Sequence, residues 1–254
     1  MTTGAIDHGE WVLADAFDRA APTYDSMVGL SPGYHAQLRG AAEALVDSLA
    51  VATGGPDGTM SLVDLGCGSG ASTAAVLQAW TDRGGRVDGL SVTGVDASTG
   101  MVQEARRKAW PSGTDFVVAD AVAHLANLPS GSVDGVLASY LLRNVPDRGK
   151  LVTEMVRALR PGGTLVVHDY SVAGSVRARA TWATMVHAIV IPLAVVKRSD
   201  VELHRYLYRS VRDFDSVQRI CNRMLDENLV GVRHRTYPGV QRGLVHTVVG
   251  SKPS

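Results

Sequence analysis

A glycine-rich turn is the segment of this sequence best suited to approach a small ligand. It contains Gly66, Gly68 and Gly70, which let the backbone come close to a ligand where any side chain would collide. Its G-x-G-x-G spacing differs from the G-x-G-x-x-G typical of dinucleotide sites, and Asp64, just before it, would repel a phosphate. A carboxylate there can instead orient the cationic end of an amino acid. The turn therefore favours a ligand that carries an ammonium group and no phosphate.

Two further carboxylates stand at the ends of expected strands. Asp96 occupies the position whose carboxylate pairs with ribose hydroxyls in open α/β sheets. Asp120 follows the next strand and could accept a hydrogen bond from an adenine amino group. S-adenosylmethionine combines adenine, ribose and an ammonium-bearing tail without phosphate, so we predict it as the cofactor. Asp96 could alternatively lead the following helix as a simple cap, but three aspartates that end three successive strands make this the weaker explanation.

The residues around these groups alternate between short apolar runs and helical stretches. The Val- and Leu-rich runs indicate strands that are covered on both faces, and the strand–helix alternation implies a parallel sheet. We therefore predict an α/β fold with a doubly wound, mostly parallel, seven-stranded sheet. The expected strands are Ser61–Leu65, Leu90–Val95, Asp115–Ala119, Val133–Ser139, Thr164–His168, Gly231–Tyr237 and Leu244–Val249, and the expected helices of this region are Ala71–Trp80, Thr99–Lys108 with Ser98 as its cap, and Gly149–Leu159.

We expect a single domain over residues 1–254, built from four segments. Residues 10–50 form an N-terminal helical cap, and residues 61–170 form the cofactor-binding core. Residues 173–228 form a helical lid that supplies the acceptor pocket. Residues 229–254 contain the closing strands, with a hairpin around Pro238-Gly239.

Composition excludes several classes of protein. The 254 residues include 25 basic and 25 acidic side chains and are 45% hydrophobic, which argues against disorder and against a nucleic-acid binder with a basic surplus. Cys67 and Cys221 provide neither a disulfide framework nor a metal-ligand set, so we expect a reducing compartment and no metal. The N-terminus lacks a secretory signal, and the longest apolar stretch, Ala180–Val196, is too short to span a bilayer. These features predict a cytoplasmic protein without a transmembrane segment.

The balanced charge is unevenly distributed along the chain. From Lys197 onward, eleven basic side chains stand against six acidic ones. A solvated helical face explains this excess, and so does a basic lid that attracts an anionic ligand or a membrane surface. Peripheral contact with a membrane therefore stays open.

Several motifs make the sequence resemble class I S-adenosylmethionine-dependent methyltransferases, and more narrowly the ubiquinone/menaquinone C-methyltransferase (UbiE-type) family. The broader resemblance rests on Asp64–Gly70, Gly94–Ser98, Ala119–Ala121 and Leu159–Gly163. The narrower one rests on Phe17-Asp18, Tyr24-Asp25, Leu142–Asp147, Tyr206–Val211 and the ending near Gly243. The sequence departs from the quinone family at His168–Ser171, where that family usually has a Glu-Phe-Ser ending, and at Gly239–Gly250 with His246.

The resemblance implies roles for individual residues. Tyr24 would close over the cofactor or substrate, Ala97 and Met101 would pack on the adenine, and Cys67 would contribute its backbone. Ser139 and Tyr140 would face the methyl group, and Arg143-Asn144 would belong to the substrate site. The implied cofactor-binding set is Tyr24, Asp64, Gly66, Cys67, Gly68, Gly70, Asp96, Ala97, Met101, Asp120, Ala121 and Ser139.

Methyl transfer to an aromatic carbon or a hydroxyl requires removal of a proton. The candidate bases are His168, Asp169 and His187, and Arg143 could stabilise the anion of an acceptor hydroxyl. Each has an alternative interpretation. His187 could be a packing residue of the lid, and His168 could point into the sheet. Arg143 could simply pair with an acid such as Asp147.

The lid segment predicts the nature of the acceptor. Its apolar side chains would form a wall for a small hydrophobic, aromatic acceptor such as a quinol, phenol or indole, although the same helix could pack only on the core or on a second subunit of a homodimer. We expect methylation at carbon. O-methylation of a secondary metabolite, or a cofactor-dependent reaction without transfer, is the alternative. Arginine outnumbers lysine 21 to 4, which hints at a GC-rich genome and keeps secondary metabolism open. The substrate-side residues are Tyr140, Asn144, Tyr170, Trp182 and Met185, with His187, Ile191 and Leu193 in the wall.

Overall fold

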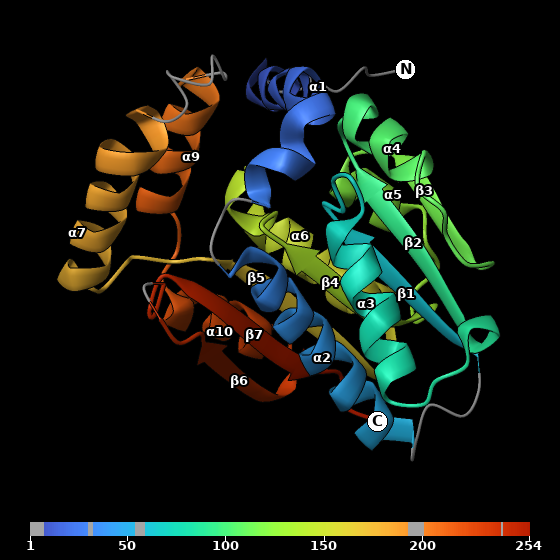
Figure 1. Cartoon of the computed structure of the whole chain (residues 1–254). Coiled ribbons are helices and arrows are strands. Elements are labelled where there is room, and N and C mark those ends of the chain that lie inside the picture. Colours follow the sequence, from blue (N-terminus) through green and yellow to red (C-terminus); the bar gives the residue numbers. More distant parts are fainter. Residues whose placement is uncertain (1–7, 30–32, 54–58, 193–200, 240) are drawn as a thin grey trace, which may run out of the picture.

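A seven-stranded sheet runs through the centre of the computed structural model, which describes residues 8–29, 33–53, 59–192, 201–239 and 241–254 (Figure 1). The strand order is β3-β2-β1-β4-β5-β7-β6. The first five strands pair in parallel, and β7 is antiparallel to both of its neighbours. This confirms the predicted α/β sheet. The strands are β1 (Met60–Leu65), β2 (Leu90–Asp96), β3 (Thr114–Val118), β4 (Val133–Ser139), β5 (Leu159–Tyr170), β6 (Val230–Thr236) and β7 (Val245–Ser251).

Helices cover both faces of the sheet. Helices α2 and α3 pack on one face, and α5, α6 and α10 pack on the other. Helix α4 packs on β2 and β3 and carries α1 on its outer side (Figure 1). The helices are α1 (His8–Val28), α2 (Tyr34–Thr53), α3 (Ala71–Asp82), α4 (Thr99–Arg106), α5 (Ala121–Ala126), α6 (Arg148–Ala158), α7 (Val176–Met185), α9 (Val201–Arg212) and α10 (Val217–Asp226), with short 3₁₀ turns at Val87–Gly89 and Leu142–Asn144 and a π-helical turn at Val186–Val190.

The apolar runs of the strands supply two cores at once. Successive residues of a strand point to opposite faces, so Leu62 contacts the α2–α3 layer while Val63 contacts the α5–α6–α10 layer. Leu137 and Ala138 of β4 divide in the same way. A strand with two buried faces needs no polar alternation, which explains the sequence pattern.

Side-chain caps fix where several helices begin. Ser98 accepts a hydrogen bond from Met101 N at the start of α4, as predicted. Asp120, Asp147, Ser175 and Ser216 play the same part for α5, α6, α7 and α10. In each case the side-chain oxygen of the capping residue accepts a hydrogen bond from a backbone N–H that has no partner within its helix.

Some segments differ from the sequence-based expectation. Helix α5 was not anticipated, because its six residues are too few to show a helical period. Strand β5 begins at Leu159, well before the expected Thr164, because Leu159 already pairs with Val133 of β4. The residues between Leu159 and Thr164 form an irregularity in the strand, where Gly162 has φ of +77°. Helix α10, expected in the lid, packs on β6, β7 and α6. Helix α2, expected in the N-terminal cap, packs on β4, β5 and α3.

The elements that stand away from the sheet are therefore α1, α7 and α9. Helices α7 and α9 lie side by side at one end of the sheet, and α1 lies beside α4 (Figure 1). Within the described residues, no helix is long and apolar enough to cross a membrane. Leu193 of the expected apolar wall falls in the stretch 193–200, outside the described residues.

The buried face of α2 provides a test of the packing. Leu45 is fully buried between α2 and the sheet, and its side chain lies close to Gly135. We expect Leu45→Ala to lower the free energy of unfolding by about 2–5 kcal/mol, because it removes buried methyl groups and leaves a cavity. The same change at Leu225, which is 51% exposed, is the matched control and should cost well under 1 kcal/mol. Urea denaturation measures both, and equal losses would contradict the proposed core.

Candidate active site

The glycine turn is shaped by left-handed backbone conformations. Gly66, Gly68 and Gly70 have φ of +70°, +53° and +93°, in the region that side chains rarely adopt. The N–H groups of Gly66 and Cys67 donate to the carbonyl of Val95 at 2.7 and 3.1 Å, which fastens the turn to β2. A Cβ on Gly68 would meet no atom within 4 Å. The turn is thus held from behind and open in front, as a ligand-facing turn must be.

Asp96 links the turn to the end of β2. Its carboxylate accepts hydrogen bonds from the N–H groups of Gly68 and Ser98, both at 2.9 Å. Ser98, not Asp96, caps α4, so the simple-cap interpretation of Asp96 is wrong. Burial raises the pKa of Asp96, and the two N–H donors oppose that rise. A carboxylate fixed at this strand end can accept hydrogen bonds from sugar hydroxyls.

Asp64 lies beneath the turn with one oxygen in use and one unused. Its Oδ2 accepts from Ser72 Oγ and Thr73 Oγ1, each at 2.7 Å. Its Oδ1 is buried and has no hydrogen-bond partner among the described residues. Burial raises the pKa of Asp64 to about 6. An unmatched carboxylate oxygen at this depth suits a positively charged ligand group.

The other predicted cofactor residues differ in exposure. Ala97 is exposed, Met101 is buried in α4, and Ser139 Oγ at the end of β4 is buried without a partner among the described residues. Asp120 is exposed and caps α5 through Ala123 N, and Ala121 is buried behind it.

The thiol of Cys67 is a poor candidate for chemistry. It lies inside the turn, where burial raises its pKa well above the usual value and keeps it protonated. The backbone N–H of the same residue holds the turn to β2. Cys67 therefore contributes to the site through its backbone geometry.

Helix α1 covers the turn through two aspartates that follow from the Phe17-Asp18 and Tyr24-Asp25 motifs. Asp18 accepts from Ser98 Oγ and from Gly100 N, the latter at 2.8 Å. Asp25 accepts from Ser69 Oγ and from Lys108 Nζ. Asp18 thus joins α1 to the start of α4, and Asp25 joins it to the glycine turn.

Tyr24 lies between the two halves of the site. Its ring packs edge-on against Phe17 at 6.1 Å between centroids. The charges of Arg143 and Asp96 both act on its hydroxyl, and burial raises its pKa. The hydroxyl is therefore within electrostatic range of both Asp96 beside the turn and Arg143 after β4.

A buried ion pair stands at the carboxyl ends of β4 and β5. Arg143 Nη1 pairs with Asp169 Oδ1, and both side chains are almost completely buried. The guanidinium also donates to the carbonyl of Tyr140 at 2.9 Å, while Arg143 Nε is buried without a partner among the described residues. Burial raises the pKa of Asp169, and the guanidinium opposes that rise. The predicted alternative partner, Asp147, is instead the cap of α6.

Aromatic rings surround this ion pair. The ring of Tyr140 stacks on that of Tyr34, with centroids 5.7 Å apart and an interplanar angle of 12°. The ring centroid of Tyr170 lies 5.3 Å from that of Tyr140. The Arg143 guanidinium carbon lies 5.6 Å from the Tyr140 ring and 6.0 Å from the Tyr170 ring. On the lid side, Trp182 lies 5.0 Å from Tyr170. The structure thus brings together a cation and an aromatic wall.

His168 is engaged on both ring nitrogens. Nδ1 lies 2.9 Å from Thr247 Oγ1, and Nε2 lies 3.1 Å from the Tyr140 hydroxyl. The residue is fully buried in β5, and burial lowers its pKa to about 3. His168 is therefore a neutral member of a hydrogen-bond network, which makes it a weak proton acceptor.

The lid reaches the site through a polar contact of Tyr206 and through apolar packing. Tyr206 on α9 donates to Asn144 Oδ1 at 3.2 Å, and Asn144 Nδ2 donates to the Tyr140 carbonyl. Met185 and Ile191 pack in the same cluster as Trp182 and Tyr170. His187 is exposed, and its ring contacts Tyr208, so it stands apart from the ion pair.

Sequence reasoning missed Gln37, Tyr237 and Thr247, which belong to the same network. The Tyr237 hydroxyl donates to the main-chain carbonyl of Gln37 at 3.1 Å and lies 2.6 Å from Thr247 Oγ1. Gln37 Oε1 accepts from the Tyr140 hydroxyl at 3.1 Å. These residues are far apart in the chain, and no local motif marks them.

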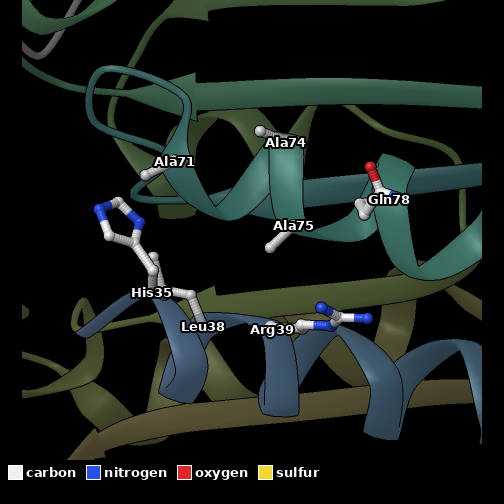
Figure 2. A pocket seen from close by; sticks show the side chains of 7 residues that line it. All are labelled: His35, Leu38, Arg39, Ala71, Ala74, Ala75 and Gln78. Carbon is white, nitrogen blue, oxygen red and sulfur yellow. The ribbon is translucent and has the colours of Figure 1, made fainter. Parts of the chain in front are cut away.

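A hollow of about 290 Å³ lies between α2 and α3, beside the turn (Figure 2). Ala71, Ala74 and Ala75 form its α3 side, while His35, Leu38 and Arg39 come from α2. Its polar groups are largely committed, because Arg39 Nη2 and Gln78 Nε2 both donate to Asp82. The hollow is separate from the ion pair and offers no comparable chemistry.

The sheet order, the open glycine turn and the strand-end carboxylates define an S-adenosylmethionine-dependent methyltransferase. The residues fit that cofactor: Asp64 offers a free buried oxygen to an ammonium group, Asp96 can accept from ribose hydroxyls, and Gly68 leaves space in front of the turn. The cofactor supplies a methyl group already activated on a positive sulfur.

Comparison with known proteins gives the family. The chain belongs to the ubiE/COQ5 methyltransferase family, whose model matches residues 6–252. It is 31% identical to the demethylmenaquinone methyltransferase of Beutenbergia cavernae over 242 residues, covering 94% of this chain and 91% of the relative. It is 32% identical over 164 residues to the ubiquinone/menaquinone biosynthesis C-methyltransferase UbiE of Campylobacter jejuni, covering 63% of each chain.

A solved structure shares the fold. The magnesium protoporphyrin IX methyltransferase of Synechocystis, with bound cofactor, aligns with a TM-score of 0.61 at 17% identity. The alignment covers 99% of this chain and 100% of the Synechocystis chain. At this identity the likeness concerns the fold alone.

Two glycines allow a matched test of the turn. Gly68 and Gly84 both have positive φ, and a Cβ on either would meet no atom within 4 Å. Alanine at either position should therefore cost a similar amount of stability, about 1 kcal/mol. Only Gly68→Ala places a methyl group in the predicted cofactor space, so it should weaken S-adenosylmethionine binding at least tenfold in calorimetry. Gly84→Ala should leave Kd within about twofold, and equal effects would argue against the site.

Asp64 predicts a pH dependence of cofactor binding. The ammonium group of the ligand binds the ionised carboxylate of Asp64. This carboxylate becomes protonated as the pH falls through its pKa of about 6. Affinity for S-adenosylhomocysteine should be nearly constant above pH 7 and fall as much as tenfold per unit well below pH 6. In Asp64→Asn the affinity should be lower at pH 8 and the slope shallower. An unchanged slope in that variant would exclude Asp64 as the titrating group.

Proposed function

We propose that this methyltransferase acts on a small hydrophobic aromatic acceptor that carries a hydroxyl group, of the quinol type, and that it methylates a ring carbon. The observation that supports this most directly is the buried Arg143–Asp169 pair among tyrosine rings. A buried cation with an unpartnered Nε is suited to an oxyanion. The rings suit a flat apolar partner.

The charges suggest how the acceptor is activated. Removing a proton from a ring hydroxyl spreads negative charge onto the neighbouring ring carbons. The Arg143 guanidinium stabilises the oxyanion and occupies its lone pairs, so the ring carbon is left as the better nucleophile. Asp169 is the proton acceptor that the arrangement favours, since His168 is engaged on both nitrogens and His187 is exposed. Burial, which raises the pKa of Asp169, makes it a stronger base.

The lid supports an enclosed apolar acceptor. Trp182 and Met185 of α7 pack in one cluster with Tyr140 and Tyr170, the two rings that lie beside the Arg143 guanidinium. Excluding water there strengthens the interaction between the guanidinium and an anion. Relatives named for demethylmenaquinone and for ubiquinone/menaquinone biosynthesis agree with a quinol-like acceptor.

An acceptor panel tests the proposed function. Purified protein with S-adenosylmethionine would be offered a short-chain demethylmenaquinone in reduced form, simple phenols and indoles. We expect the quinol to gain one methyl group by mass spectrometry, and NMR to place it on a ring carbon. Methylation on oxygen would contradict the carbon assignment. A lack of methylation of every aromatic acceptor would contradict the proposed acceptor class.

Arg143→Lys tests the guanidinium while keeping the buried charge. Lysine cannot offer the same planar set of donors, so we expect kcat/KM for the quinol to fall about 100-fold with cofactor affinity little changed. Arg179→Lys, on the exposed face of α7, is the matched control. Retention of more than half of the activity in Arg143→Lys would overturn the role of Arg143.

A further inference from the structure

The residue that follows β4 has an unusual backbone. Tyr140 has φ of +57°, one of two residues other than glycine with positive φ in the described part of the chain. A bulky side chain rarely adopts this left-handed region, so surrounding contacts must hold it there. Such conformations collect at functional sites, and the contacts that enforce this one can be named.

Both ends of Tyr140 are held inside the protein. Its N–H donates to the carbonyl of His168 at 2.7 Å. Its hydroxyl lies 3.1 Å from His168 Nε2 and 3.1 Å from Gln37 Oε1. Both partner side chains are themselves buried, His168 completely and Gln37 to 3% exposure. The phenol is therefore an internal anchor, because its hydroxyl contacts two buried side chains.

The partners of the hydroxyl are fixed in turn. His168 Nδ1 contacts Thr247 Oγ1 on β7, and Gln37 Nε2 donates to Gln241 Oε1. Tyr237 closes the circuit by donating to the main chain of Gln37. The network connects α2, β5 and β7, so three regular elements of the fold hold the Tyr140 hydroxyl in place.

The carbonyl of Tyr140 contacts a different set of groups, which belong to the proposed acceptor site. It accepts hydrogen bonds from Arg143 Nη1 at 2.9 Å and from Asn144 Nδ2 at 3.2 Å. Both donors belong to the turn directly after Tyr140, so the direction of this one carbonyl sets where the guanidinium and the amide lie.

We propose that the hydroxyl of Tyr140 is an anchor, and that His168 and Gln37, which hold it, are positioning residues for methyl transfer. The anchor keeps the left-handed backbone at Tyr140 and thereby keeps its carbonyl directed at Arg143 and Asn144. His168, an expected base, acts here through Tyr140 and exchanges no proton with the acceptor. This inference rests on the proposed role of Arg143 at the acceptor.

Kinetics of Tyr140→Phe test the anchor with the ring retained. We expect kcat for the reduced short-chain demethylmenaquinone to fall about 10- to 100-fold, because a small displacement of a catalytic group has a large effect on rate. KM and the Kd for S-adenosylmethionine should stay within about threefold of the parent. Tyr208→Phe, which removes a lid hydroxyl outside the network, should leave kcat within about twofold. A Tyr140→Phe enzyme with parental kcat would overturn the proposal.

A glycine rescue separates positioning from simple packing. Glycine adopts positive φ freely whereas alanine does not, so Tyr140→Gly should retain several-fold more activity than Tyr140→Ala, although it is the smaller residue. If Tyr140 mattered only as a filled volume, alanine would be at least as active as glycine. That result would overturn the anchor.

Crystal structures provide a readout that does not depend on finding the acceptor. In Tyr140→Phe with S-adenosylhomocysteine, we expect residue 140 to leave the left-handed region and Arg143 Nη1 to move beyond hydrogen-bond distance of its carbonyl. An unchanged 2.9 Å contact would overturn the inference. Failure of the acceptor panel together with loss of this contact would reject the proposed acceptor while retaining the anchor.

Discussion

Two opposite charges buried together constrain the carboxyl ends of β4 and β5. Arg143 and Asp169 are 6% and 1% exposed at the side chain, so neither can recover hydration and each depends on the other. Leaving one unpaired would cost several kcal/mol. Because Asp169 ends β5 and Arg143 follows β4, the pair holds the two central loops together. The tyrosine wall and the lid are arranged around it, and Asn144 extends it to α9.

The cofactor side uses charge differently. Asp64 and Asp96 are both carboxylates whose pKa values are raised by burial, and among the described residues neither forms an ion pair with a cationic side chain. Each instead relies on hydroxyl or N–H donors. This leaves negative charge beneath the turn for a positively charged ligand, whereas Arg143 stands beside Asp169 at the proposed acceptor site. The two halves therefore differ in charge: the cofactor half carries carboxylates held by hydroxyl and N–H donors, and the other half carries a paired cation and anion.

Features that depend on local spacing could be predicted from the sequence, whereas features that depend on long-range contacts could not. The glycine turn, the mostly parallel α/β sheet and the Ser98 cap could be predicted, because each follows from the residue pattern of short segments. Asp147 looked like a partner for Arg143 because it is near in the chain, but it caps α6, and Asp169 reaches the guanidinium from the adjacent strand. Likewise, no pattern within one segment could join His168 to Thr247, since β5 and β7 meet only in the folded sheet.

The attachment of α1 sets a gradient of local stability across the molecule. Helix α2 buries large apolar side chains such as Leu45 against the sheet, whereas α1, among its described side chains, buries only the small ones of Ala20 and Ala21 and is tied to the turn and to α4 by Asp25 and Asp18. The Asp25–Lys108 pair is half exposed, and such pairs contribute little to stability. Segments held in this way open at much lower cost than the core. We therefore expect α1, which covers the glycine turn, to open at lower cost than the sheet unfolds, so that a ligand could reach the turn by local opening alone.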